Sequence, residues 1–213
     1  MLKWRLLWVG VLVSLLCILW PGALAPHIRS VSRLDRLVNQ MEGPLPSSKH
    51  AQTPLSLVAA TYPLAPTYYY HFDRHVTANI RPIFEEAVGV FNRTGLVRLV
   101  PGMPGKRQNG LTFFTYQRDT SKQAGDFVEL GEGGPTVKHR SGWQAFTVNR
   151  AKAGLNLAHP ELRIRVSVAI HEIGHALGLA HSESRQSIMY PLDQQHETLS
   201  AADLRALSLL YQE

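Results

Sequence analysis

The chain has 213 residues and a formal net charge of +6, with 45% hydrophobic and 18% charged residues, which is an ordinary composition for a globular protein. Its basic residues are spread along the sequence and form no dense run with interleaved aromatic residues, so a nucleic-acid partner is not predicted. The positive charge instead favours either binding to anionic surfaces and acidic substrates or only the solubility of the protein.

The first 25 residues have the character of a targeting segment. Lys3 and Arg5 precede an apolar run over residues 6–20, and residues 23–25 read Ala-Leu-Ala, a small-residue cleavage pattern. The uncharged span 6–25 is also about long enough to cross a bilayer, and tryptophans lie near its ends. Residues 1–25 are therefore predicted to be a signal peptide or an N-terminal membrane anchor. Both place the rest of the chain outside the cell, because the positive end stays in the cytoplasm.

Residues 26–65 are predicted to form a stalk, a linker or a short pro-region. Residues 32–42 can make one small amphipathic helix, which ends before Gly43-Pro44. The prolines between residues 43 and 66 indicate an extended linker. Residues 66–213 are then long enough for one catalytic domain, and a monomer is expected.

The domain is predicted to be α+β, with a mixed twisted sheet and helices packed on it. Strands are expected over 67–72, 96–100, 111–116, 136–140 and 143–149, where short runs are rich in aromatic and β-branched residues. Helices are expected over 79–92, 162–178 and 200–211. The last begins at Ser200 with Asp203 three residues later, a variant of the capping box.

The predicted helix 162–178 carries the pattern H-E-x-x-H-x-x-G-x-x-H. His171 and His175 are four residues apart, so their rings project from one helix face. Glycine at position 178 lets the chain leave the helix and return His181 as a third ligand. Three histidines at this spacing predict a zinc site with its fourth position open to water, and Glu172 stands beside that position.

Two other interpretations of this pattern are a chance match and a structural zinc site. Chance accounts for the five fixed positions on the order of once in 10^5 chains of this size, given average residue usage. A structural zinc site usually has four protein ligands, often cysteines, and the only cysteine is Cys17 in the targeting segment. A catalytic zinc ion is therefore predicted. Five other histidines of the predicted domain, at positions 71, 75, 139, 159 and 196, are expected to be surface or core residues.

The extended motif with the downstream methionine of Ser187-Ile-Met-Tyr-Pro191 resembles the metzincin metallopeptidases. Ser182 directly after the third histidine, and the segment 199–211, are similar to matrixins, the matrix-metalloproteinase type. The specific match covers residues 166–213, and a looser match in element order extends back to about residue 66.

The resemblance implies an extracellular zinc endopeptidase that acts on protein or peptide substrates. Glu172 would be the general base that accepts a proton from the attacking water and passes it to the leaving amine. Met189 would lie beneath the ligand rings, and Tyr190 and Pro191 would start the wall of a substrate pocket. An edge strand near 134–140 would pair with an extended substrate.

The chain also departs from the family. The run Pro191-Leu-Asp193 replaces a common Pro-x-Tyr in the pocket wall, and no cysteine follows position 17, so thiolate latency cannot operate. The ligands of a second, structural zinc in animal members are absent. The corresponding stretch carries acids that are either Ca²⁺ ligands or solvated loop residues: Asp126, Glu129 and Glu132.

The sequence thus predicts a secreted or membrane-anchored zinc metalloendopeptidase. Two alternatives stay open at this point: a non-catalytic extracellular binding module that keeps the metal, and a hydrolase of cell-wall peptides. Retention of Glu172 argues against the binding module, because a purely structural site has no use for a base.

Overall fold

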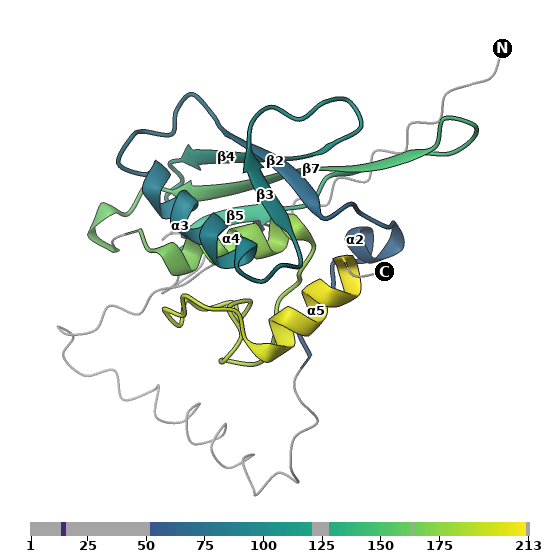
Figure 1. The fold of residues 1–213 in the computed structure, drawn as a ribbon. Helices are drawn as coiled ribbons and strands as arrows, with labels where there is room; N and C mark the ends of the chain where they lie inside the picture. The colour runs from purple at the N-terminus through teal and green to yellow at the C-terminus, as the bar shows by residue number, and fades with distance from the viewer. Residues whose placement is uncertain (1–13, 16–51, 121–127, 163, 212–213) are drawn as a thin grey trace, which may run out of the picture.

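The computed structural model describes residues 14–15, 52–120, 128–162 and 164–211. A mixed sheet forms the upper part of the molecule in Figure 1, and helices pack below it. The strands are β1 (Ser14–Leu15), β2 (Thr67–Phe72), β3 (Arg98–Pro101), β4 (Asn109–Tyr116), β5 (Gly131–Gly134), β6 (Val137–Arg140) and β7 (Phe146–Asn156). The helices are α2 (Leu57–Thr61), α3 (Arg81–Asn92), α4 (Val166–Leu177) and α5 (Ala201–Tyr211), with a 3-10 turn at Pro160–Leu162. The predicted α+β fold is confirmed.

The sheet has the order β1-β5-β7-β4-β2-β3. Strands β3, β2, β4 and β7 run parallel to one another, and β5 pairs with the other side of β7 in the antiparallel direction. A parallel pair requires a crossover, and α3 supplies it between β2 and β3. Strand β6 pairs with the first part of β7, and this hairpin projects from one end of the molecule (Figure 1).

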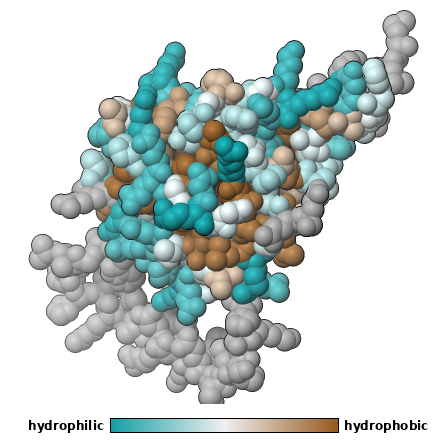
Figure 2. Space-filling model, in the orientation of Figure 1, coloured by the Kyte–Doolittle hydropathy of each residue, from teal (hydrophilic) through white to brown (hydrophobic). Residues whose placement is uncertain are grey.

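The core lies between the sheet and helices α3 and α4. Phe84 of α3 stacks on Phe113 of β4 with ring centroids 4.5 Å apart, and both side chains are fully buried. Almost every residue of α4 is buried, which suits a helix packed between the sheet and the segment that follows it. Figure 2 shows hydrophobic residues gathered in the middle of this face and hydrophilic residues projecting around them. Helix α4 therefore lies in the interior of the molecule.

Most predicted elements occur within a few residues of their expected positions. The strand 67–72 is found at those residues, and the predicted helices 79–92, 162–178 and 200–211 correspond to α3, α4 and α5. The predicted strand 143–149 is longer than expected, since β7 continues to Asn156. Strand β5 was not predicted; it lies between β1 and β7 in the sheet and packs against Glu172 of α4. The edge strand predicted near 134–140 corresponds to β6, which pairs only with β7 among the described strands, and its pairing with a substrate stays a prediction.

Part of the predicted linker packs against the domain. The amide of Ser56 donates to the carbonyl of Gly178 at 2.7 Å, and the amide of Ala180 donates to the carbonyl of Pro54 at 2.8 Å. Helix α2 follows directly, with Val58 and Ala59 buried. The division of the chain at residues 25 and 65 stays a prediction, and these contacts fasten residues 54–59 to the end of α4.

The predicted helix 32–42 and nearly all of the targeting segment lie outside the described residues. Within that segment, Ser14 and Leu15 form β1, which pairs antiparallel with β5 opposite Glu132 and Gly131. Among the residues that the structure describes, no helix has the length and apolar character of a membrane span.

Candidate metal centre

The end of α4 brings the three motif histidines together. Gly178 caps the helix in the left-handed conformation, with φ of 107°. A side chain there would also lie 2.4 Å from Cβ of Ala59, so glycine is required on both counts. After the turn, the ring of His181 lies 5.6 Å from that of His171 and 5.1 Å from that of His175, measured between centroids.

Backbone carbonyls fix the orientation of two of these rings. Nδ1 of His171 contacts the carbonyl of Ile188 at 2.7 Å, and Nδ1 of His175 contacts the carbonyl of Leu179 at 2.9 Å. Because a carbonyl only accepts, each Nδ1 carries the proton, and each neutral ring keeps its lone pair on Nε2. The two Nε2 atoms lie 3.0 Å apart, and Nε2 of His181 is buried without a hydrogen-bond partner.

This geometry fits a zinc ion. Potential ligand atoms of the three histidines lie within 4.8 Å of one another, and no other such group occurs in the part of the chain that the structure describes. Tetrahedral ligands at zinc–nitrogen distances of about 2.0–2.1 Å would be about 3.3 Å apart, close to the observed 3.0 Å. Burial lowers the pKa of His171 and of His181 to about 4 and that of His175 well below its ordinary value, so all three rings are neutral at neutral pH.

Met189 packs against α4 at Gly174, and its predicted place beneath the ligand rings stays a prediction. Its Sδ lies 2.5 Å from the position that a Cβ on Gly174 would take, so the helix surface is open there only because residue 174 is glycine. Met189 is fully buried, and its carbonyl accepts from the amide of Ser182 at 2.9 Å. The methionine segment is therefore tied to the chain immediately after the third histidine.

Glu172 is fully buried and lies against β5. A Cβ on Gly131 would lie 2.6 Å from Oε1 of Glu172, and a Cβ on Gly133 would lie 2.4 Å from its carbonyl oxygen and 2.9 Å from Oε2. Two glycines are thus needed for β5 to approach α4 so closely, and the position of this strand bounds the position of the Glu172 carboxylate.

Asp203 of α5 organises the segment below the histidines, a role that the sequence did not predict. Its carboxylate accepts from Oγ1 of Thr53 and Oγ of Ser187, both at 2.5 Å, and from the amide of Ile188 at 3.2 Å. The capping box with Ser200 is confirmed, since the amide of Ser200 donates to Asp203 at 2.9 Å and the Asp203 amide donates back to the Ser200 hydroxyl at 3.2 Å. The cap signal located this residue, but its long-range partners had no sequence signal.

A small cavity lies beside His171, between α4 and the segment after Met189. It has a volume of about 10 Å³, room for one water molecule, and the buried hydroxyl of Ser167 in its lining has no hydrogen-bond partner. Tyr190 and Pro191 are half-buried between the lining residues Ile188 and Asp193. Their predicted role in a pocket wall stays a prediction.

Two of the three acids predicted as possible Ca²⁺ ligands lie near the start of β5. Glu129 and Glu132 both contact the guanidinium of Arg118, and Asp126 lies outside the described residues. Calcium binding stays a prediction. The ion pair with Arg118 was not predicted, because Arg118 is eleven residues from Glu129 and the sequence gives no sign that they meet.

Comparison with known families decides the affiliation of the chain. The matrixin model of the M10 peptidases matches residues 103–212, slightly more than half of the 213 residues. The chain belongs to the matrixin family. The predicted resemblance is confirmed, and with it the zinc metalloendopeptidase class and the zinc cofactor at the level of the family.

Individual matrixins match over a shorter stretch. The chain is 50% identical over 50 residues to matrix metalloproteinase-26 of Homo sapiens and 44% identical over 50 residues to matrilysin of Felis catus, each alignment covering 22% of this chain and 19% of the relative. It is 48% identical over 48 residues to macrophage metalloelastase of Oryctolagus cuniculus, covering 21% of this chain and 10% of the relative. The aligned part is thus about a fifth or less of each relative's length.

Proposed function

We propose that this matrixin is an extracellular zinc-dependent endopeptidase, with His171, His175 and His181 as zinc ligands and Glu172 as general base. The observation that carries the proposal is the convergence of three neutral imidazoles on one point, with a buried carboxylate on the adjacent residue of the same helix. A purely structural zinc site would usually have a fourth protein ligand, and none is grouped with these histidines among the described residues.

Bound zinc would supply a Lewis acid that lowers the pKa of water and polarises the substrate carbonyl. Glu172 would take the proton of the attacking water and deliver it to the leaving amine. Its burial against β5 limits competing contacts with bulk water. The hydrogen bonds to the carbonyls of Ile188 and Leu179 would hold two ligand rings in one orientation and one tautomer.

The outer edge of β5 supports an extended polypeptide as substrate. Ser14 and Leu15 pair with this edge as an antiparallel strand, so its backbone groups can accept another chain. A peptide bound there would lie beside Glu172, since Gly131 and Gly133 of the same strand contact that residue. The extracellular location rests on the targeting character of residues 1–25 and on the family.

The test is the zinc content of the full-length protein and its cleavage of casein, beside a Glu172→Gln variant of the same shape. We expect about one zinc ion per chain in both proteins and a loss of about 10²–10⁴-fold in cleavage rate in the variant. Replacing Glu86, which is exposed on α3, by glutamine is the matched control and should leave cleavage unchanged.

The other outcomes separate the alternatives. A parent that binds zinc and cuts no protein would favour the binding module or the cell-wall peptide hydrolase. A parent that binds no zinc contradicts the proposal.

A further inference from the structure

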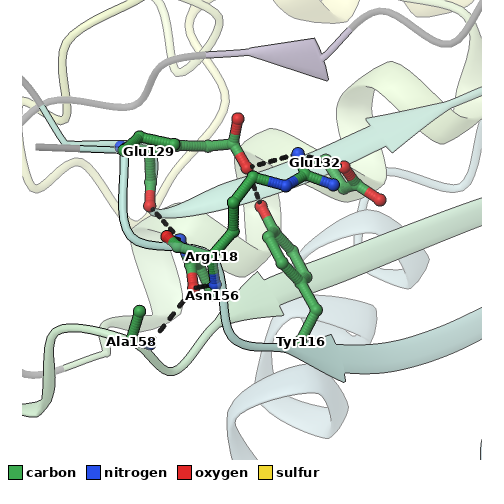
Figure 3. A network of polar contacts seen from close by, with 7 residues as sticks. Tyr116, Arg118, Glu129, Glu132, Asn156 and Ala158 are labelled. Carbon is green, nitrogen blue, oxygen red and sulfur yellow. Dashed lines mark hydrogen bonds and ion pairs between the residues drawn. The ribbon is translucent and has the colours of Figure 1, made fainter. Parts of the chain in front are cut away.

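Two carboxylates near the start of β5 share one guanidinium nitrogen. Nη1 of Arg118 lies 3.0 Å from Oε1 of Glu129 and 3.2 Å from Oε2 of Glu132 (Figure 3). The same Oε1 of Glu129 accepts from the hydroxyl of Tyr116 at 2.6 Å. One cation therefore bridges two anions.

Burial makes this arrangement more demanding than a surface ion pair. The side chain of Glu129 is 7% exposed and that of Glu132 is 12% exposed, whereas that of Arg118 is 47% exposed. Burial raises the pKa of Tyr116, and its hydrogen bond to Glu129 raises it further, so the phenol remains a donor to that carboxylate. Without the guanidinium, two poorly hydrated carboxylates would face each other, which is unfavourable.

The network fastens the ends of three strands. Nδ2 of Asn156, at the end of β7, donates to the carbonyl of Arg118 at 2.7 Å and to that of Glu129 at 2.8 Å. The amide of Arg118, just after β4, donates to Oδ1 of Asn156 at 3.0 Å. Figure 3 shows these residues drawn together from the ends of their strands. The start of β5 is thus held by both Arg118 and Asn156.

Strand β5 in turn bounds Glu172. Glu132 lies between Gly131 and Gly133, the two glycines that contact Glu172. Because there is no side chain at either glycine, a shift of the strand would open or close space directly at the carboxylate. A misplacement of about 1 Å at a reacting group can cost on the order of 10²-fold in rate.

We propose that Arg118 is a positioning residue that acts as a built-in cation between Glu129 and Glu132 and so holds β5 in place against Glu172. Removal of its charge leaves a pair of carboxylates open to solvent on the side that Arg118 vacates, and that pair then takes a divalent cation such as Ca²⁺. The catalytic part of this inference rests on the proposed function, and the cation-binding part does not.

The test compares Arg118→Met, Arg118→Lys and the matched control Arg98→Met, all in the full-length protein. Arg98 is exposed on β3 at the opposite edge of the sheet. In calcium-free buffer, Arg118→Met should retain zinc, melt at a lower temperature and lose about 10²-fold in kcat, with a smaller change in KM. Arg118→Lys should retain most of the activity, and Arg98→Met should behave as the parent.

Calcium gives the readout that a merely structural role would not move. Arg118→Met should bind Ca²⁺ in a calorimetric titration at about 10⁻⁴–10⁻³ M, and Ca²⁺ should raise both its melting temperature and its kcat. Parent and Arg98→Met should show no such response. Adding Glu132→Gln to Arg118→Met should abolish the binding.

Three results overturn the proposal: Arg118→Met with the kcat of the parent, Arg118→Met without calcium binding, or Arg118→Lys as impaired as Arg118→Met. If Arg118→Met is unfolded in calcium-free buffer, recovery of its circular dichroism on adding Ca²⁺ supports the proposal, and no recovery overturns it. The calcium titration does not depend on cleavage. A parent protein that cuts no protein would therefore contradict the proposed function, and calcium binding by Arg118→Met would still test the cation-binding part of the inference.

Discussion

The two sides of the candidate site are built in different ways. The lower side consists of α4, the segment Ser187–Met189 and Asp203, and it is held by hydrogen bonds to carbonyls, a buried carboxylate and apolar packing. The upper side consists of β5, which is held by the close packing of its glycines against Glu172 and by the ion pairs of Arg118. The lower side carries the metal ligands and Glu172, and the upper side bounds the position of the Glu172 carboxylate. Damage to the two sides should therefore have separable effects on zinc binding and on catalysis.

The largest effect is expected from the lower side, where His181→Ala removes one ligand. His181 is half-buried in the loop after α4, so the fold should survive its loss. Zinc affinity and cleavage should each fall by more than the roughly 10–100-fold that changes around a metal ligand produce. Zinc titration with a competing chelator checks this. His75→Ala is the control, since His75 is exposed and its ring contacts Asp73 rather than the three histidines. Equal zinc affinity in both variants would contradict the three-histidine centre.

Asp203→Asn should break the support of the lower side without touching the metal ligands. The NH₂ group of asparagine would face groups that now donate hydrogen bonds to the carboxylate, such as the Ser187 hydroxyl and the Ile188 amide. We expect a loss of about 3 kcal/mol in the free energy of unfolding and a fall in Tm of about 6–12 °C. Differential scanning calorimetry measures both. Asp73→Asn, at an exposed residue, should change Tm little, and an equal shift in the two variants would show that the Asp203 network is not special.

Gly133→Ala tests the upper side. The added Cβ would lie 2.4 Å from the carbonyl oxygen of Glu172, so β5 must move away from α4. We expect a loss of about 1–3 kcal/mol in stability and a fall in kcat, with zinc content unchanged. Gly89→Ala in the middle of α3 is the control and should leave kcat unchanged. A Gly133→Ala variant that loses zinc and activity together would mean that the two sides are not separable.

Met189→Leu should have the smallest effect. The substitution conserves volume and keeps an apolar side chain against Gly174, so stability should fall by less than about 1.5 kcal/mol. Zinc affinity and kcat should stay within a few-fold of the parent, as measured by chelator competition and casein cleavage. A loss of activity at full stability and zinc content would show that the thioether does more than pack.

The difference between the two sides also explains what could be predicted from the sequence. The histidine ligands and the turn at Gly178 lie within eleven residues, so spacing alone brings them together. Strand β5 has the sequence Gly-Glu-Gly-Gly, which has poor β-propensity. It becomes a strand through pairing with β7 and close contact with Glu172, and both are tertiary effects.

The polar networks were predicted only where they are local. The cap between Ser200 and Asp203 spans three residues and was found, whereas the bond from Thr53 to Asp203 spans 150 residues and left no pattern. Arg118 and Glu132 likewise meet only because the ends of β4 and β5 are brought together by β7. The spacing of Arg118 and Glu132 in the sequence follows no helix or strand period that would predict this contact.

The central claim is a zinc ion held by His171, His175 and His181 with its fourth position open. X-ray absorption at the zinc edge of the full-length protein tests it most directly. The claim predicts three imidazole nitrogens at about 2.0–2.1 Å and one oxygen from water, with two imidazoles in any zinc that His181→Ala retains. A sulfur ligand, a fourth imidazole, or a parent protein without zinc would contradict it.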